Sequence, residues 1–256
     1  MSDTIDAAAQ PAANLQRVHN PESPASLVPP PARDLVRLAQ GFYFVFWGLL
    51  VTVLTGTQLL MLAGIRTSTE SFLGAGVLAT LIGSWRLYQV RSLGERWRNR
   101  TRVVLALAAL LTYFCVCFSL WRRVPDSAYL LGNALAFLAT GICYVIVFNH
   151  AMAALGTALG RPDMTLESRV FSASNVVLLL LPFACVIVYL TGMIVIRHSN
   201  AFAELQWLLD RANLLVVIVL LLPFSLTLSL AWGCKDAVLR QLGASDHQGQ
   251  QDSGPT

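Results

Sequence analysis

Six long apolar stretches dominate the pattern of hydrophobic and polar positions along this chain. They run over 42–64, 72–90, 103–121, 128–149, 174–196 and 213–234. A helix needs about 20 apolar residues to cross about 30 Å of hydrocarbon, and each stretch is close to that length. The pattern therefore predicts an all-α, polytopic membrane protein with about six transmembrane helices.

The two ends of the chain lack this pattern. Residues 1–36 are rich in Ala, Pro, Ser and Asn and hold no apolar core, which favours a disordered cytoplasmic tail over a cleavable signal peptide. Residues 241–256, rich in Gln, Ser, Asp and Gly, are expected to form a second disordered cytoplasmic tail. The intervening residues 37–240 are then a six-helix transmembrane domain, which a short interfacial helix over 33–40 introduces.

Composition agrees with a membrane location. The chain is 55% hydrophobic and 12% charged, whereas about a quarter of the residues in a soluble domain are charged. Lys235 is the only lysine among 18 basic residues, and this arginine bias, together with abundant Ala and Leu, is typical of a GC-rich bacterial genome. We therefore expect a multi-pass protein of the bacterial inner membrane, with the lipid bilayer as its surroundings.

The distribution of basic residues predicts the orientation of the chain. Twelve of them fall in the two tails and in the second and fourth loops, and five fall in the first, third and fifth loops. Loops that are rich in Arg and Lys stay in the cytoplasm. Both termini are therefore predicted to be cytoplasmic.

Small residues recur at four-residue spacing in three spans, and such stripes let helices approach closely in lipid. The stripes are Gly48, Thr52 and Gly56; Ala75, Ala79 and Gly83, flanked by Gly76, Thr80 and Ser84; and Gly132, Ala136 and Thr140. They predict that the first, second and fourth spans form a close-packed centre. The fifth and sixth spans are rich in Leu, Val and Ile and are expected to face lipid.

Matching proline strings interrupt the fifth and sixth spans. Each reads Leu-Leu-Leu-Pro-Phe, with Pro182 in one and Pro223 in the other. A proline inside a helix removes a backbone donor and frees the carbonyl four residues earlier, so both positions are predicted helix kinks. Paired broken helices can mark a transport site. No polar cluster is expected beside either proline, however, and this favours a structural role for the kinks.

Three residues near the inner membrane boundary are candidates for binding. His150 follows Asn149 at the end of the fourth span, and Arg86 lies one turn inside the end of the second span. Ionisable residues at membrane depth often carry function. The alternatives are that Arg86 extends its charged end to the interface, and that His150 bonds to a neighbouring residue or to lipid headgroups.

A basic segment follows the second span and resembles a cytoplasmic helical extension over 86–102. One face of this helix would be apolar, with Leu87, Val90, Leu93 and Trp97. Gly94 would weaken the helix by about 1 kcal/mol relative to Ala. The predicted contacts to anionic lipid are the arginines on its other faces: Arg91, Arg96, Arg98, Arg100 and Arg102. A membrane protein partner is the alternative for the same segment.

Catalytic and cofactor motifs are missing from the sequence. All fourteen acidic residues lie in tails, loops or span boundaries, which disfavours a proton-coupled antiporter. None of the five cysteines has the spacing of a metal site. We expect no catalytic residues, no metal, no cofactor and no nucleic-acid partner.

Three functions remain open. The first is a non-catalytic subunit or accessory of a membrane complex, because the spans carry few motifs. The second is a permease for a small molecule or lipid. Six spans, an interfacial helix and a basic cytoplasmic loop are similar in layout, though in no motif, to ABC-2-type permease subunits. The third is a lipid-modifying enzyme at the inner interface, near Arg86, Asn149 and His150.

Overall fold

The computed structural model describes residues 30–61, 67–124, 127–160, 162–197 and 214–251. These ranges are helical apart from short turns and contain no strand. The helices are α2 (Ala32–Met61), α3 (Thr67–Tyr88), α4 (Glu95–Arg123), α5 (Ala128–Ala158), α6 (Pro162–Arg197) and α8 (Leu214–Gln251). The all-α class is therefore confirmed for the described part of the chain.

Four of these helices are long and apolar enough to cross a membrane. The qualifying segments are Ala32–Gln58, Glu95–Trp121, Ala128–Ala158 and Thr165–Met193. This confirms a membrane-spanning character for the described part of the chain. A total of six spans and the side on which each terminus lies stay predictions.

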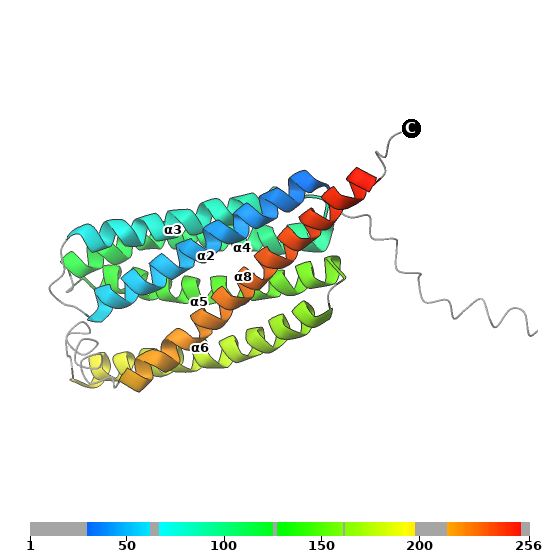
Figure 1. The fold of residues 1–256 in the computed structure, drawn as a ribbon. Helices are drawn as coiled ribbons and strands as arrows, with labels where there is room; N and C mark the ends of the chain where they lie inside the picture. Colours follow the sequence, from blue (N-terminus) through cyan, green and yellow to red (C-terminus); the bar gives the residue numbers. More distant parts are fainter. Residues whose placement is uncertain (1–29, 62–66, 125–126, 161, 198–213, 252–256) are drawn as a thin grey trace, which may run out of the picture.

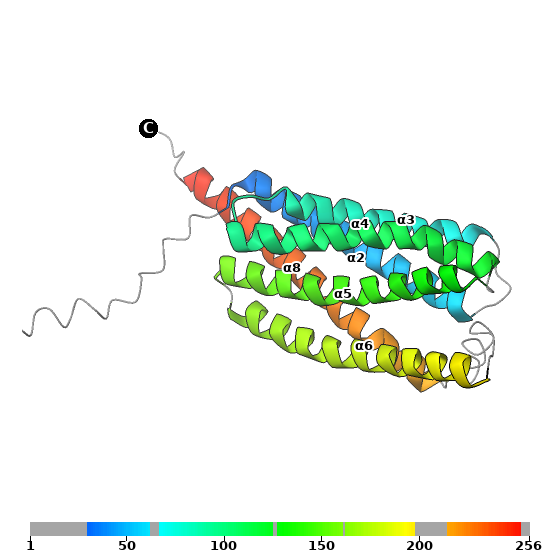
Figure 2. The ribbon, with the colours of Figure 1, turned by 180° about the vertical axis from the view of Figure 1, so that it is seen from behind.

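The helices form a closed bundle. Each described helix packs against the next one along the chain, and α8 packs back against α2. Figures 1 and 2 show α2, α3 and α4 on one side and α5 and α6 on the other, with α8 running obliquely from α6 to α2. Because of this crossing, α8 also contacts α5.

The helix pair α2 and α3 approaches most closely, through glycines. A Cβ atom on Gly48 would lie 2.5 Å from the backbone nitrogen of Thr80, and one on Gly83 would lie 2.7 Å from the backbone nitrogen of Val45. The predicted contact between the first and second spans is therefore confirmed. On α3 the row that faces α2 contains Gly76 and Thr80, whereas Ala75 of the neighbouring row is exposed.

The expectation that the fourth span shares this close-packed centre is wrong. α5 packs against α4, α6 and α8, and Gly132 is exposed with open space beside it. α5 reaches α2 and α3 through large side chains instead. The rings of Phe148 and Phe42 have centroids 6.4 Å apart, and the hydroxyl groups of Tyr144 and Ser84 lie 3.0 Å apart. These large side chains keep the backbones separated.

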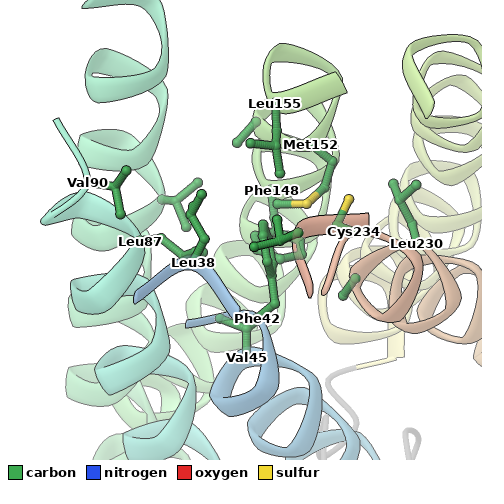
Figure 3. Close-up of a cluster of buried hydrophobic side chains, with 14 of the residues drawn as sticks. Leu38, Phe42, Val45, Leu87, Val90, Phe148, Met152, Leu155, Leu230 and Cys234 are labelled. Atoms are coloured by element: carbon green, nitrogen blue, oxygen red, sulfur yellow. The ribbon is translucent and has the colours of Figure 1, made fainter. Parts of the chain in front are cut away.

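The main hydrophobic core lies where α2, α3, α4, α5 and α8 meet (Figure 3). Its labelled side chains are Leu38, Phe42, Val45, Leu87, Val90, Phe148, Met152, Leu155, Leu230 and Cys234. The presence of Leu230 and Cys234 corrects the expectation that the sixth span faces lipid, because this part of α8 is buried against α2 and α5. α6 does follow the expectation, and Val177, Leu181 and Val188 are exposed on it.

The predicted helical extension over 86–102 is interrupted, because residues 89–94 form a tight connection between the antiparallel helices α3 and α4. α3 ends at Tyr88, Gly94 takes a φ of 87°, and α4 begins at Glu95. Glycine adopts this left-handed backbone without the steric cost of a Cβ atom, so the chain reverses there. Leu87 and Trp97 are buried in the main core, and the Trp97 indole nitrogen donates to the Leu87 carbonyl at 3.3 Å.

The ends of the bundle also differ from the sequence-based boundaries. α2 begins at Ala32, so the predicted interfacial helix over 33–40 is continuous with the first span. α8 continues to Gln251, so 241–251 of the predicted C-terminal tail is helical. Residues 1–29 of the other predicted tail and 252–256 lie outside the described residues.

Candidate functional site

Three buried polar side chains converge where α5, α6 and α8 meet. Asn149 from α5 donates its amide nitrogen to the Thr227 hydroxyl oxygen at 3.2 Å, and Asn175 from α6 donates to the same oxygen at 2.9 Å. All three side chains are fully excluded from solvent. We call this set, Asn149, Asn175 and Thr227, the polar junction.

The polar junction adjoins the proline of α8. The Thr227 hydroxyl donates to the carbonyl oxygen of Pro223 at 3.0 Å, one turn earlier in the same helix. The expectation that no polar cluster lies beside either proline is therefore wrong for Pro223. Thr227 uses its single donor and both acceptor positions of its oxygen in these bonds. It has no further hydrogen-bonding capacity.

The two asparagines retain hydrogen-bonding capacity that Thr227 lacks. The Oδ1 atoms of Asn149 and Asn175 are buried and have no hydrogen-bond partner within the described part of the chain. A buried carbonyl oxygen without a donor costs about 1–3 kcal/mol. Such atoms in a native protein call for an explanation, and a role in binding is one. The junction therefore offers two acceptors to a group that can donate.

Both proline strings pack against one small cluster near the polar junction. Phe183 and Phe224, which follow Pro182 and Pro223, pack against one cluster of buried residues. That cluster consists of Ile142, Val145 and Leu179. The two proline strings therefore pack against the same part of α5 and α6, although the chain separates them.

His150 lies on a different face of α5 from Asn149. Its side chain is exposed, and its Nδ1 atom lies 2.8 Å from the Ile146 carbonyl oxygen and 3.1 Å from the Ser172 hydroxyl of α6. The Arg100 guanidinium of α4 donates to the His150 carbonyl oxygen. His150 and Arg100 thus link α4, α5 and α6 at the rim of the bundle. The alternative that His150 bonds to neighbours matches these contacts.

The remaining predicted residues occupy separate places. Arg86 is half-buried on α3, and the described contacts join it to neither Asn149 nor His150. Of the five arginines predicted to contact lipid, Arg100 bonds to α5, and Arg98 lies 4.0 Å from Glu95. The exposed members of this set are Arg91, Arg96, Arg98 and Arg102.

A surface cleft lies between the start of α2 and the end of α3. Its volume is about 500 Å³, and it is lined by Asp34, Arg37, Trp85, Tyr88, Gln89 and Arg91. Asp34 and Arg37 form an ion pair at 3.7 Å. Of these residues only Arg91 was a predicted site residue. The others come from two distant segments, so the cleft exists only once α2 and α3 have packed.

Comparisons with known proteins add no relative: no family model, no curated protein and no solved structure matches the chain. Within the described ranges, no group of three or more His, Cys, Asp and Glu residues has an arrangement that could hold a metal ion.

Proposed function

We infer that this chain is a six-span permease of the bacterial inner membrane, with both termini in the cytoplasm. The observation that carries this inference is the polar junction beside Pro223. Unpaired polar groups at membrane depth are expensive unless they line a cavity or meet a ligand. Binding sites in transporters are built where broken helices free polar groups.

The chemistry of the junction indicates the class of solute. The free Oδ1 atoms of Asn149 and Asn175 accept hydrogen bonds, so the solute must donate them from an N–H or O–H group. A small polar molecule with an amide, hydroxyl or ammonium group fits this requirement. The described part of the junction holds no ionised side chain, so specificity would come from hydrogen bonding.

The arrangement of α8 supports movement around this site. α8 contacts α6 and α5 near the polar junction, and its far part packs against α2. Pro223 removes a backbone hydrogen bond inside α8 and weakens the helix at that point. Bending there would separate Thr227 from the two asparagines and open the junction. An accessory subunit of a membrane complex, the first hypothesis from sequence, needs no such opening.

Cysteine accessibility tests the permease. A variant with the five native cysteines replaced by Ala would receive Thr227→Cys or Asn175→Cys, and would be treated from each side with a membrane-impermeant methanethiosulfonate reagent. Labelling from both sides is expected, because a permease exposes its binding site alternately. Ala134→Cys, buried in a cluster of mainly apolar side chains, is the control and should stay unlabelled. A junction that never reacts would contradict the permease and favour the accessory subunit.

A further inference from the structure

The cleft between α2 and α3 carries a second binding chemistry, independent of the polar junction. It brings the guanidinium groups of Arg37 and Arg91 together with one carboxylate, from Asp34. The side chain of Arg37 is 28% exposed, and its ion pair with Asp34 at 3.7 Å is too long for a strong hydrogen bond. The formal charge of the cleft is therefore positive, and its arginine donors have capacity left.

Two arginines in one cleft favour a phosphate group. A guanidinium presents its donors in a planar fork that matches two oxygens of a phosphate, and such charge-assisted bonds are the strongest hydrogen bonds in proteins. A volume of about 500 Å³ leaves room for more than a bare ion. A phosphate with an organic substituent fits both the charge and the size.

Aromatic rings place the cleft at the level of lipid headgroups. Trp85 is 51% exposed, and its ring centroid lies 6.2 Å from that of Tyr88, one turn further along α3. Tryptophan and tyrosine concentrate at the membrane–water interface, because their rings are apolar and their N–H and O–H groups are polar. A ligand in the cleft would therefore lie among headgroups.

An exposed apolar stripe leads away from the cleft along α3. Leu78, Ile82 and Trp85 are each about half exposed, and their spacing puts them on one side of the helix. This stripe would accommodate an acyl chain, which a phospholipid has and a soluble phosphate lacks. We propose that the cleft binds the phosphate of a membrane phospholipid through Arg37 and Arg91, with an acyl chain along Leu78 and Ile82.

Lipid titration tests this proposal. The purified full-length protein in detergent would be titrated with dioleoyl-phosphatidylglycerol, and the bound lipid would be counted by native mass spectrometry. Replacing both arginines by glutamine (R37Q/R91Q) should weaken binding about 30-fold, since each basic residue at a membrane surface contributes about a fivefold gain. Arg91→Gln alone should weaken it about fivefold. Because Arg91 is exposed, this single variant guards against misfolding of the double variant.

Matched controls distinguish lipid binding in the cleft from a general attraction between anionic lipid and the positive charge of the protein. The R169Q/R240Q variant removes the same charge from exposed sites on α6 and α8, neither of them a predicted lipid contact, and should weaken binding less than threefold. Equal losses in the two double variants would overturn the proposal.

Inorganic phosphate and glycerol 3-phosphate form the soluble arm of the titration. If either binds as tightly as the lipid, the site serves a soluble phosphate and the lipid assignment is wrong. Labelling of Thr227→Cys reports on the permease and is independent of both results.

Discussion

A single hydroxyl group, that of Thr227, connects three helices. It accepts from Asn149 of α5 and from Asn175 of α6, and it donates to the Pro223 carbonyl within α8. In lipid, helices gain little from apolar contact with one another, so hydrogen bonds of this kind contribute to their association. The Thr227 hydroxyl therefore contributes to the association of α5, α6 and α8.

Replacing Thr227 by Val tests this role, because the two side chains have nearly the same shape. The variant leaves both asparagine amides without their acceptor, so the free energy of unfolding should fall by about 1–3 kcal/mol. Bonds between membrane helices average about 0.6 kcal/mol, which favours the lower part of that range. Unfolding in mixed detergent micelles would measure the change.

Thr112→Val supplies the matched control. The Thr112 hydroxyl donates to the Ala108 carbonyl at 2.9 Å within α4. Its loss should cost less than about 0.5 kcal/mol. Equal losses for the two variants would mean that the polar junction adds nothing to stability.

The sequence predicted only part of the polar junction. Asn149 is a visible candidate because it precedes a histidine at a span boundary, and Pro223 is visible as a helix breaker. Asn175 and Thr227 are ordinary residues in their own spans. Their meeting depends on how three helices are rotated about their axes, and one sequence without structure does not supply these rotations.

At the scale of elements, the seam between α2 and α3 depends on glycine. The sequence predicted the small residues of both helices and their meeting, but it gave two candidate rows on α3. Adjacent residues differ by about 100° around a helix, so Ala75 and Gly76 point to different neighbours. Both rows are small, and only the packed structure shows that the contact with α2 runs through Gly76, Thr80 and Gly83, so that it takes members of both rows and leaves Ala75 exposed.

Gly48→Ala should destabilise the protein strongly. The new Cβ atom would lie 2.5 Å from the Thr80 backbone nitrogen and 2.8 Å from the Gly76 carbonyl oxygen, so the backbones of the two helices must separate. We expect a loss of about 1–3 kcal/mol, the usual range for overpacking. Thermal unfolding in detergent would show it.

Gly56→Ala is the control within the same helix. A Cβ atom on Gly56 meets nothing within 4 Å, and alanine is the better helix former by about 1 kcal/mol. This variant should be neutral or slightly stabilising. If Gly48→Ala behaved in the same way, α2 and α3 would not be in contact as described.

At the scale of the molecule, the path of α8 is the feature that the sequence could not supply. The fifth and sixth spans have similar Leu, Val and Ile content, yet α6 exposes much of its surface and the far part of α8 is buried against α2. Lipid tails and apolar side chains offer a helix the same kind of surroundings. Composition alone therefore does not tell a lipid-facing helix from a central one.

The orientation of the whole bundle has its own test. Reporter tags at Ser2 and at Thr256 should both report the cytoplasm, because loops rich in arginine are expected to stay on that side. Fusions to alkaline phosphatase, which is active only outside the cytoplasm, should be inactive at both ends. An active fusion at one end would require an odd number of spans, and active fusions at both ends would invert the orientation.

The closure of the bundle by α8 has a consequence for biosynthesis. The chain is synthesised from its N-terminus, so α2, α5 and α6 enter the membrane before the helix that connects them. Until the ribosome has passed Thr227, the amides of Asn149 and Asn175 have no acceptor from α8, and the side of α2 that α8 will cover is open. An unfinished chain thus holds two carboxamide nitrogens that lack the acceptor which Thr227 supplies in the finished bundle.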